Sequence, residues 1–325
     1  MSSFRLTLLL VVVGLLTSLS VLADVPDGVG AASYARQPLT ARPSAMGGAF
    51  VSIAEGLAAA YYNPAGLGRD TPYELGGMYS LPYGEAFDTS LQFIGINGNL
   101  NLQTSSANLS GMGWNVGWLG LSIRNIWLWD DEGEPTIGSS TSSLYTASVG
   151  MAIPGVDGLS AGGSIKIYRD SLLEGRSFGI GADLAVLLDF AIGDVPISVG
   201  FNAKDIGETR VHWYGTAGEP DNFVPWVNKM GLSTRLFEDY LLVAAELDWA
   251  VGRPAEEQRA GIGFEVTPVP QLAIRGGWLG GLDGSGGAYT AGVGIYLAET
   301  FRLDYAYRTR RILGAGHMLS VSYTF

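Results

Sequence analysis

Few side chains in this sequence are of the types that carry out covalent catalysis. The 325 residues include no Cys and only two His, His212 and His317. The segment Gly158–Gly162 fits the pattern G-x-S-x-G, but a serine nucleophile needs a strand–turn–helix setting and a His base, and this segment opens a stretch that reads as a strand. Two His and no Cys leave little for a metal site. The sequence therefore predicts a protein that is not an enzyme, with no metal site and no cofactor.

The charged residues that could bind a ligand alternate with apolar residues along several segments. Arg readily binds a carboxylate, so Arg275, Arg302 or Arg308 could anchor an anionic head group. The signs on this face are mixed, which argues against a simple ion-selective pore. In the alternative, which stays open here, the charges pair with one another and with Arg42 and Glu55. The candidate ligand-binding residues on this face are Arg124, Lys166, Asp183, Glu246, Asp248, Arg275, Arg302, Asp304 and Arg308.

The alternation has a period of two, which predicts β-strands after residue 70. In the segment 317–325, Leu319, Val321, Tyr323 and Phe325 share one face, with Ser or Thr between them. The same pattern runs through several other segments. One face is almost always apolar or aromatic, and the other carries Gly, Ser and charges of both signs. The positioning elements are therefore strands with one apolar and one polar face.

Two architectures could bury or cover such strands: a soluble sandwich or a membrane barrel whose apolar face meets lipid. The strands have about 9–12 residues, enough to cross a bilayer when tilted, and Tyr and Trp lie near their ends, as an interfacial girdle requires. We expect an all-β fold, a 14-stranded antiparallel transmembrane β-barrel over residues 71–325. The expected strands lie near 73–81, 89–98, 114–129, 143–153, 159–169, 178–188, 195–204, 225–236, 240–251, 259–267, 270–279, 287–297, 300–309 and 317–325, with long loops that include 130–142, 170–177 and 205–224 and a polar stretch at 99–111.

The first 23 residues have the layout of a cleaved signal peptide. Arg5 precedes an apolar run from Leu6 to Leu22, and Ala23 offers a small residue at the expected cleavage site. The alternative is a permanent anchor. Asp24 follows the site, so the sequence does not predict a lipoprotein. A formal net charge of −12 argues against a nucleic-acid partner.

Residues 24–70 lack the alternation and are rich in small residues. Irregular chain can lie at membrane depth only inside protein or in a water-filled cavity. A plug inside the barrel satisfies that condition; the alternative is a periplasmic extension. Asn63 can bracket a turn and Pro64 fixes the following φ, so this segment can fold with defined bends.

Two runs within this segment carry a family resemblance. The run from Arg42 to Val51 (RPSAMGGAFV) and the run from Tyr61 to Leu67 (YYNPAGL) resemble the N-terminal signature of the FadL/PorV superfamily, with a spelling closer to PorV/PorQ-like proteins. The resemblance covers residues 42–67. The residues of this plug motif are Arg42, Met46, Gly47, Gly48, Glu55, Asn63, Pro64, Ala65 and Gly66.

The resemblance implies a 14-stranded barrel with an N-terminal hatch in the outer membrane of a Gram-negative-type cell. The FadL branch takes up fatty acids and other hydrophobic molecules, which favours a plugged conduit for hydrophobic small molecules. The PorV/PorQ branch serves type IX secretion, which implies the alternative of a scaffold or shuttle for exported proteins. The partners expected are outer-membrane lipid, the barrel-assembly machinery, and either a hydrophobic ligand or a secreted protein, with no nucleic acid. We expect a monomer.

Overall fold

A computed structural model of the chain describes residues 32–69, 71–84, 88–104, 107–129, 133–216, 218–251, 258–282, 287–298, 300–309 and 315–325. The expected signal peptide, residues 1–23, lies outside the described residues. Within the described ranges, no helix is both long enough and apolar enough to cross a membrane.

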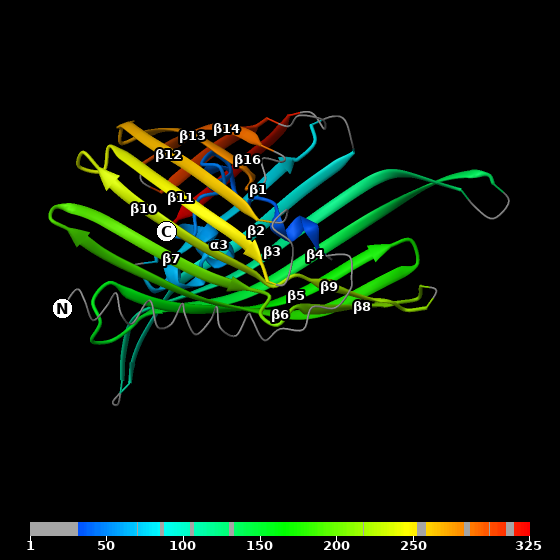
Figure 1. The fold of residues 1–325 in the computed structure, drawn as a ribbon, viewed down its shortest axis with the longest axis horizontal. Helices are drawn as coiled ribbons and strands as arrows, with labels where there is room; N and C mark the ends of the chain where they lie inside the picture. Colours follow the sequence, from blue (N-terminus) through cyan, green and yellow to red (C-terminus); the bar gives the residue numbers. More distant parts are fainter. Residues whose placement is uncertain are drawn as a thin grey trace.

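Fourteen antiparallel strands form a closed barrel (Figure 1), which confirms the expected fold class. Consecutive barrel strands are hydrogen bonded in order, and β1 pairs with both β2 and β16, which closes the ring. The barrel strands are β1 (Glu74–Leu81), β2 (Thr89–Thr104), β3 (Ala107–Trp129), β4 (Pro135–Ala152), β5 (Leu159–Leu172), β6 (Gly175–Ile192), β7 (Val195–Lys204), β10 (Val227–Leu236), β11 (Leu241–Ala250), β12 (Arg259–Val269), β13 (Leu272–Gly281), β14 (Ala288–Leu297), β15 (Phe301–Arg308) and β16 (Gly316–Thr324).

Side chains on the barrel strands alternate between the interior and the outer surface. On β6, for example, Ser177 and Asp183 are buried, whereas Phe178 and Ile180 between them are exposed. The same alternation leaves a broad set of large apolar side chains on the outside, including Ile94, Val116, Ile165, Leu232, Ile262, Ile274 and Leu319. An outer apolar band around a closed barrel is the arrangement that a bilayer requires.

Several strands extend further than the hydrophobic pattern indicates. β2 and β3 continue through the polar stretch 99–111, and β4 and β6 begin inside the expected loops 130–142 and 170–177. The expected loop 205–224 contains two further strands, β8 (Thr209–Tyr214) and β9 (Asp221–Val224), of which β8 pairs with β6. Outside the bilayer no lipid requires one face of a strand to be apolar, so the alternation of apolar and polar residues ends there. The backbone pairing of the strands continues beyond that point.

The connections divide the barrel into two ends. Short turns follow β4, β6, β10, β12 and β14, and we name this the short-turn end; the connections after β1, β7, β11 and β15 are longer and define the long-loop end. Figure 1 shows the β2–β3 hairpin projecting beyond the barrel body at the short-turn end and the β3–β4 hairpin projecting at the long-loop end.

Residues 32–69, named the plug from here on, form short helical turns that lie inside the barrel (Figure 1). These turns are η1 (Ser33–Arg36), α2 (Ala41–Ala45), η2 (Gly56–Ala58), α3 (Ala59–Tyr62) and η3 (Pro64–Gly68). Plug residues such as Phe50 and Tyr62 pack with inward barrel residues such as Leu144 and Tyr168 in the largest apolar cluster. The hydrophobic core therefore lies between the plug and the inner wall.

Candidate functional site

One contact between the plug and the wall is made by the short helix α2 and the glycine pair after it. α2 is followed by Gly47 and Gly48, which have positive φ values of 64° and 78°, a conformation that side chains with a Cβ rarely adopt. This bend turns the Gly47 N–H toward the Thr290 hydroxyl of β14, which accepts it at 3.0 Å and donates to the Ala45 carbonyl at 2.8 Å. The Thr290 hydroxyl therefore forms hydrogen bonds with backbone groups on both sides of the bend.

A second bend is fixed by Asn63. Its Oδ1 accepts the Ala65 N–H at 3.0 Å, and Pro64 occupies the first position of η3, where the missing N–H is not needed. The Nδ2 group donates to the carbonyls of Val51 and Val186, at 2.9 and 3.1 Å. The side chain of Asn63 therefore joins two parts of the plug to β6.

Between these bends the plug backbone lies directly on the inner wall. A Cβ at Gly263 of β12 would stand 2.2 Å from the Met46 carbonyl oxygen, and within the plug itself a Cβ at Gly66 would stand 1.9 Å from the Ala54 carbonyl oxygen. Both approaches are far too close for a side chain, so glycine is required at both positions. Other barrel glycines whose Cβ would come within 4 Å of plug atoms are Gly76, Gly111, Gly113, Gly150, Gly162, Gly200, Gly231, Gly261, Gly277 and Gly292.

Glu246 of β11 binds the plug backbone with its carboxylate. Its Oε2 accepts the N–H groups of Phe50 and Val51, both at 2.8 Å. Lys229 of β10 lies 2.8 Å from the other oxygen of Glu246 and 2.6 Å from Asp248. The predicted ligand candidates Glu246 and Asp248 therefore meet at one lysine, and Glu246 also holds the plug.

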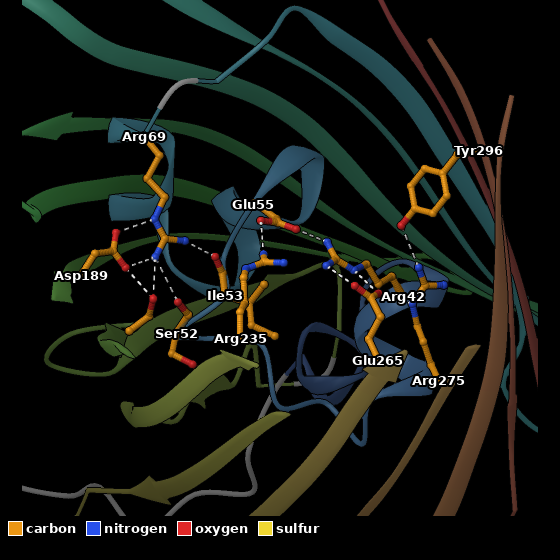
Figure 2. Close-up of polar contacts among 11 residues, drawn as sticks. Arg42, Ser52, Ile53, Glu55, Arg69, Asp189, Arg235, Glu265, Arg275 and Tyr296 are labelled. Carbon is orange, nitrogen blue, oxygen red and sulfur yellow. Dashed lines mark hydrogen bonds and ion pairs between the residues drawn. The ribbon is translucent and has the colours of Figure 1, made fainter. Parts of the chain in front are cut away.

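The plug residue Arg42 is the centre of a buried ion-pair cluster (Figure 2). Its guanidinium makes two hydrogen bonds to Glu265 of β12, at 2.7 and 2.8 Å, and pairs with Glu55 of the plug. Arg275 of β13 lies on the other side of Glu265, at 2.5 Å, and reaches Asp304 of β15 at 2.6 Å. Because Arg42, Glu265, Arg275 and Asp304 are all at least nine-tenths buried, removing one partner would leave a buried charge without compensation.

Glu55 connects this cluster to a second wall arginine. Arg235 of β10 lies 3.2 Å from Glu55. Burial by itself would raise the pKa of Glu55, but the guanidinium groups of Arg42 and Arg235 lower this pKa to about 2. The carboxylate of Glu55 is therefore ionised at neutral pH and bridges the plug to β10. Arg302 completes the cluster at 2.5 Å from Asp304.

At the end of the plug, Arg69 makes a separate contact with the wall (Figure 2). It forms two hydrogen bonds to Asp189 of β6, at 2.5 and 2.9 Å, and Ser198 of β7 donates to the same carboxylate at 2.5 Å. Arg69 also donates to the carbonyls of Ser52 and Ile53. This side chain therefore ties an earlier plug segment to the short-turn end of β6.

A third cluster lies on β5 and β6, near the long-loop end. Lys166 lies 2.6 Å from Asp183 and 2.5 Å from Asp205, and the Tyr168 hydroxyl donates to Asp205 at 2.9 Å. All four side chains are buried. Lys166 and Asp183, both predicted ligand candidates, are thus held by each other.

Lys204 of β7 differs from these paired cations. It is 7% exposed, and its Nζ lies 3.8 Å from the centroid of the Tyr61 ring. Among the described residues, no carboxylate bonds it. Lys204 and Tyr61 line a cavity of about 60 Å³ between the plug and β7, β10, β11 and β12, which is room for several water molecules.

A second cavity, of about 310 Å³, lies against the opposite face of the plug. It is lined by Ile53 and Arg69 of the plug and by Phe190, Ile197 and Leu242 of the wall. Its wall residues belong to the short-turn end, whereas those of the 60 Å³ cavity belong to the long-loop end. Cavities therefore lie on both the long-loop side and the short-turn side of the plug.

Two predicted candidates lie apart from the clusters. Arg124 is exposed and pairs with Asp88 at 2.9 Å; it does not face the interior because the β3–β4 register shifts between Ile123 and Ile126, which breaks the alternation behind the prediction. Arg308, at the end of β15, is partly buried and lines a small cavity beside the plug.

Arg69, Asp189, Asp205 and Lys229 also form these contacts, and the sequence analysis did not identify them. Lys229 has the same parity as the inward Gly231, so the period of two could have found it. Asp205 follows β7 directly, outside the alternation. Arg69 and Asp189 are 120 residues apart, and nothing local in the sequence pairs them. In the part of the chain that the structure describes, no three His, Cys, Asp or Glu side chains are grouped to hold a metal ion.

No protein-family model matches this chain. A search of curated proteins finds no match either. Solved structures with the same fold do exist. The toluene transporter TbuX of Ralstonia pickettii matches with a TM-score of 0.59 at 13% identity, over 88% of this chain and 98% of that one. The toluene transporter TodX of Pseudomonas putida matches with a TM-score of 0.58 at 14% identity, over 92% and 99%.

A FadL homologue of Pseudomonas aeruginosa matches similarly, with a TM-score of 0.58 at 11% identity, over 89% of this chain and 99% of that one. Identities this low establish a shared fold. The chain is thus a closed 14-stranded barrel of the kind that these FadL-like proteins have, and the plug contacts above are its candidate functional site.

Proposed function

We propose that this protein is a plugged conduit for hydrophobic small molecules in the outer membrane of a Gram-negative-type cell, reached through the predicted signal peptide. The shared fold with two toluene transporters supports the class of cargo. The apolar outer surface supports a place in a membrane. We infer membership of the FadL group from this fold together with the plug motif.

The observation that carries this proposal is the pair of cavities on the two faces of the plug. Cargo that enters from the long-loop end would meet the cavity at Tyr61 and Lys204 first, and the cavity at Ile53 and Arg69 lies beyond the plug. The plug is held by hydrogen bonds and ion pairs, which can open and close, and it adds no strand to the barrel. A shift of the plug would join the two cavities.

Lys204 is the cation that we expect to meet the polar end of a cargo molecule. The anchor suggested by the sequence was Arg275, Arg302 or Arg308, but Arg275 and Arg302 already bind Glu265 or Asp304. Lys204 lines a cavity beside the aromatic face of Tyr61, and no carboxylate within the described ranges bonds it. An apolar molecule with one anionic or hydrogen-bond-accepting end suits this surrounding.

The test is uptake into vesicles that contain the purified protein and have a lipopolysaccharide outer leaflet, which slows apolar solutes. We expect toluene and an aromatic acid to enter faster than into the same vesicles without protein, and sucrose to stay outside. Lys204→Met should slow the acid more than toluene, and Arg124→Gln, an exposed cation, should change neither. Equal entry with and without protein would contradict the proposal.

The sequence also resembles PorV/PorQ-like proteins, which implies a scaffold or shuttle for exported proteins. The three solved structures named above do not concern secretion, so this alternative still depends on residues 42–67 alone. Native mass spectrometry of gently extracted protein separates the two functions: a bound apolar molecule supports the conduit, and a bound exported protein supports the scaffold.

A further inference from the structure

The outer face of β5 changes character along its length. From the short-turn end, the outward side chains are first apolar, with Ile165 62% exposed and Ile167 following it. The next two outward residues are Arg169 and Ser171. The change lies toward the long-loop end, where the lipid band gives way to the head-group region.

The neighbouring strand β6 shows the same change from apolar to basic side chains at the positions paired with β5. On β6, Ile180 and Phe178 are followed outward by Arg176, and β5 pairs Ser171 with Arg176. The same register sets Arg169 opposite Phe178, so Arg169 and Arg176 are diagonal neighbours on one face. Tyr214 of β8 pairs with Arg176 from the other side. Two arginines and exposed aromatic side chains therefore share one patch of the outer surface.

Neither arginine of this patch is paired within the part of the chain that the structure describes. Arg169 and Arg176 are exposed, and among the described residues neither forms an ion pair or a hydrogen bond. Arg210 of β8 differs, since it lies 2.6 Å from Asp221. In a chain of net charge −12, two adjacent free guanidinium groups are a local exception.

The patch is also hollowed. Arg169 and Arg176 line a groove of about 440 Å³ together with hydroxyl groups such as that of Ser171. The acidic residue in this lining is Asp170, whose carboxylate accepts a hydrogen bond from Ser177 at 2.8 Å. Glu174, in the turn between β5 and β6, is outside the lining.

We propose that this groove binds phosphate groups of lipids in the external leaflet of the membrane. Guanidinium groups bind phosphate through paired hydrogen bonds, and basic residues at a membrane surface attract anionic head groups. Below the groove, Ile165 and Ile180 offer an apolar surface for the acyl chains of the same molecule. The inference rests on the membrane placement and orientation in the proposed function, with the long-loop end outside.

The test is native mass spectrometry of the full barrel in detergent, titrated with diphosphorylated lipid A, with phosphatidylcholine and with inorganic phosphate. We expect lipid A to bind at low stoichiometry and phosphatidylcholine to bind more weakly. The double substitution Arg169→Gln with Arg176→Gln should weaken lipid A binding by about tenfold, because two cations near the head group are lost. The control Arg210→Gln should leave it unchanged.

Four results would overturn the proposal: equal lipid A binding by the double variant, an equal loss in the Arg210→Gln control, inorganic phosphate binding as tightly as lipid A, or phosphatidylcholine binding as tightly as lipid A. Both substituted side chains are exposed, so the variants should fold, and a heat-dependent shift in electrophoresis checks this. Solute uptake is a separate readout, so failure of the conduit would leave this test valid.

Discussion

At the scale of single residues, the inner wall is built to bind backbone groups of the plug. Glu246 accepts two N–H groups, Thr290 bonds one N–H and one carbonyl, and Asn202 donates to the Tyr62 carbonyl at 2.9 Å. Buried backbone groups must be paired, and the short turns of the plug pair only some of their own, such as the Ala54 N–H with the Phe50 carbonyl at 2.8 Å. These wall side chains therefore provide hydrogen-bond partners that the backbone of a helix or sheet would otherwise provide.

Removing the Arg42 guanidinium should unseat the plug. Arg42→Gln leaves Glu265 with Arg275 alone inside a buried cluster, and we expect a loss of about 3–5 kcal/mol in the free energy of unfolding. Urea titration of the barrel in bilayers measures it. Arg124→Gln, which breaks an exposed pair with Asp88, should cost less than about 1 kcal/mol. Equal losses in the two variants would contradict the importance of burial.

Acid should loosen the same contact. The pKa of Glu55 is about 2 in the folded protein and 4.5 as an ordinary value. A lowered folded pKa means that the ionised form stabilises the fold fully above about pH 4.5 and that this contribution is lost as the pH falls toward 2. Leakage of a small dye from liposomes should therefore rise over this range. Glu55→Gln should remove part of the pH dependence; an unchanged profile would argue against Glu55.

The sequence was informative about which residues face inward and uninformative about their partners. Parity alone placed Lys166, Asp183, Glu246, Arg275 and Asp304 in the interior. Their partners depend on strand register, and Arg42 and Glu265 are 223 residues apart. The error at Arg124 follows from a local register shift, which no single-strand pattern contains.

At the scale of elements, the glycines of the wall form the seat of the plug. A side chain at position 263 would overlap with the Met46 carbonyl oxygen. We expect Gly263→Val to destabilise the seated plug by about 1–3 kcal/mol and to raise dye leakage, while the barrel still assembles. The outward Ala147→Val, which also introduces a valine but on the lipid side, is the control. If both variants leak alike, contact with the plug is not the cause.

The strands were predictable where they cross the bilayer, because lipid on one side and protein on the other impose the period of two. The extensions of β2, β3 and β4, together with β8 and β9, were not, because polar surroundings on both faces remove that signal. The plug bends were partly predictable: Asn63, Pro64 and the glycine pair mark them, but the wall atoms they contact lie on distant strands.

At the scale of the whole molecule, the plug is a separable unit inside a closed ring. Every barrel strand pairs with two barrel strands, and the plug contributes none of those bonds. Deleting residues 24–70 while keeping the signal peptide should therefore leave a barrel that assembles, shifts on heating in electrophoresis and leaks small polar solutes. The lumen charges would be solvated in the open barrel. Loss of assembly in this deletion would contradict the separable plug.

The contact between the Ala41 N–H and the Ser320 hydroxyl, at 3.1 Å, joins residues 279 positions apart. Ser320 lies on β16, the strand whose pairing with β1 closes the ring. Contacts of such sequence separation form late in folding, so this hydrogen bond forms only once the last strand has been delivered. A truncated chain, or one stalled during biogenesis, would lack this hydrogen bond and would hold the plug less firmly. A protease that cleaves a loosely held plug could then distinguish an unfinished barrel from a mature one.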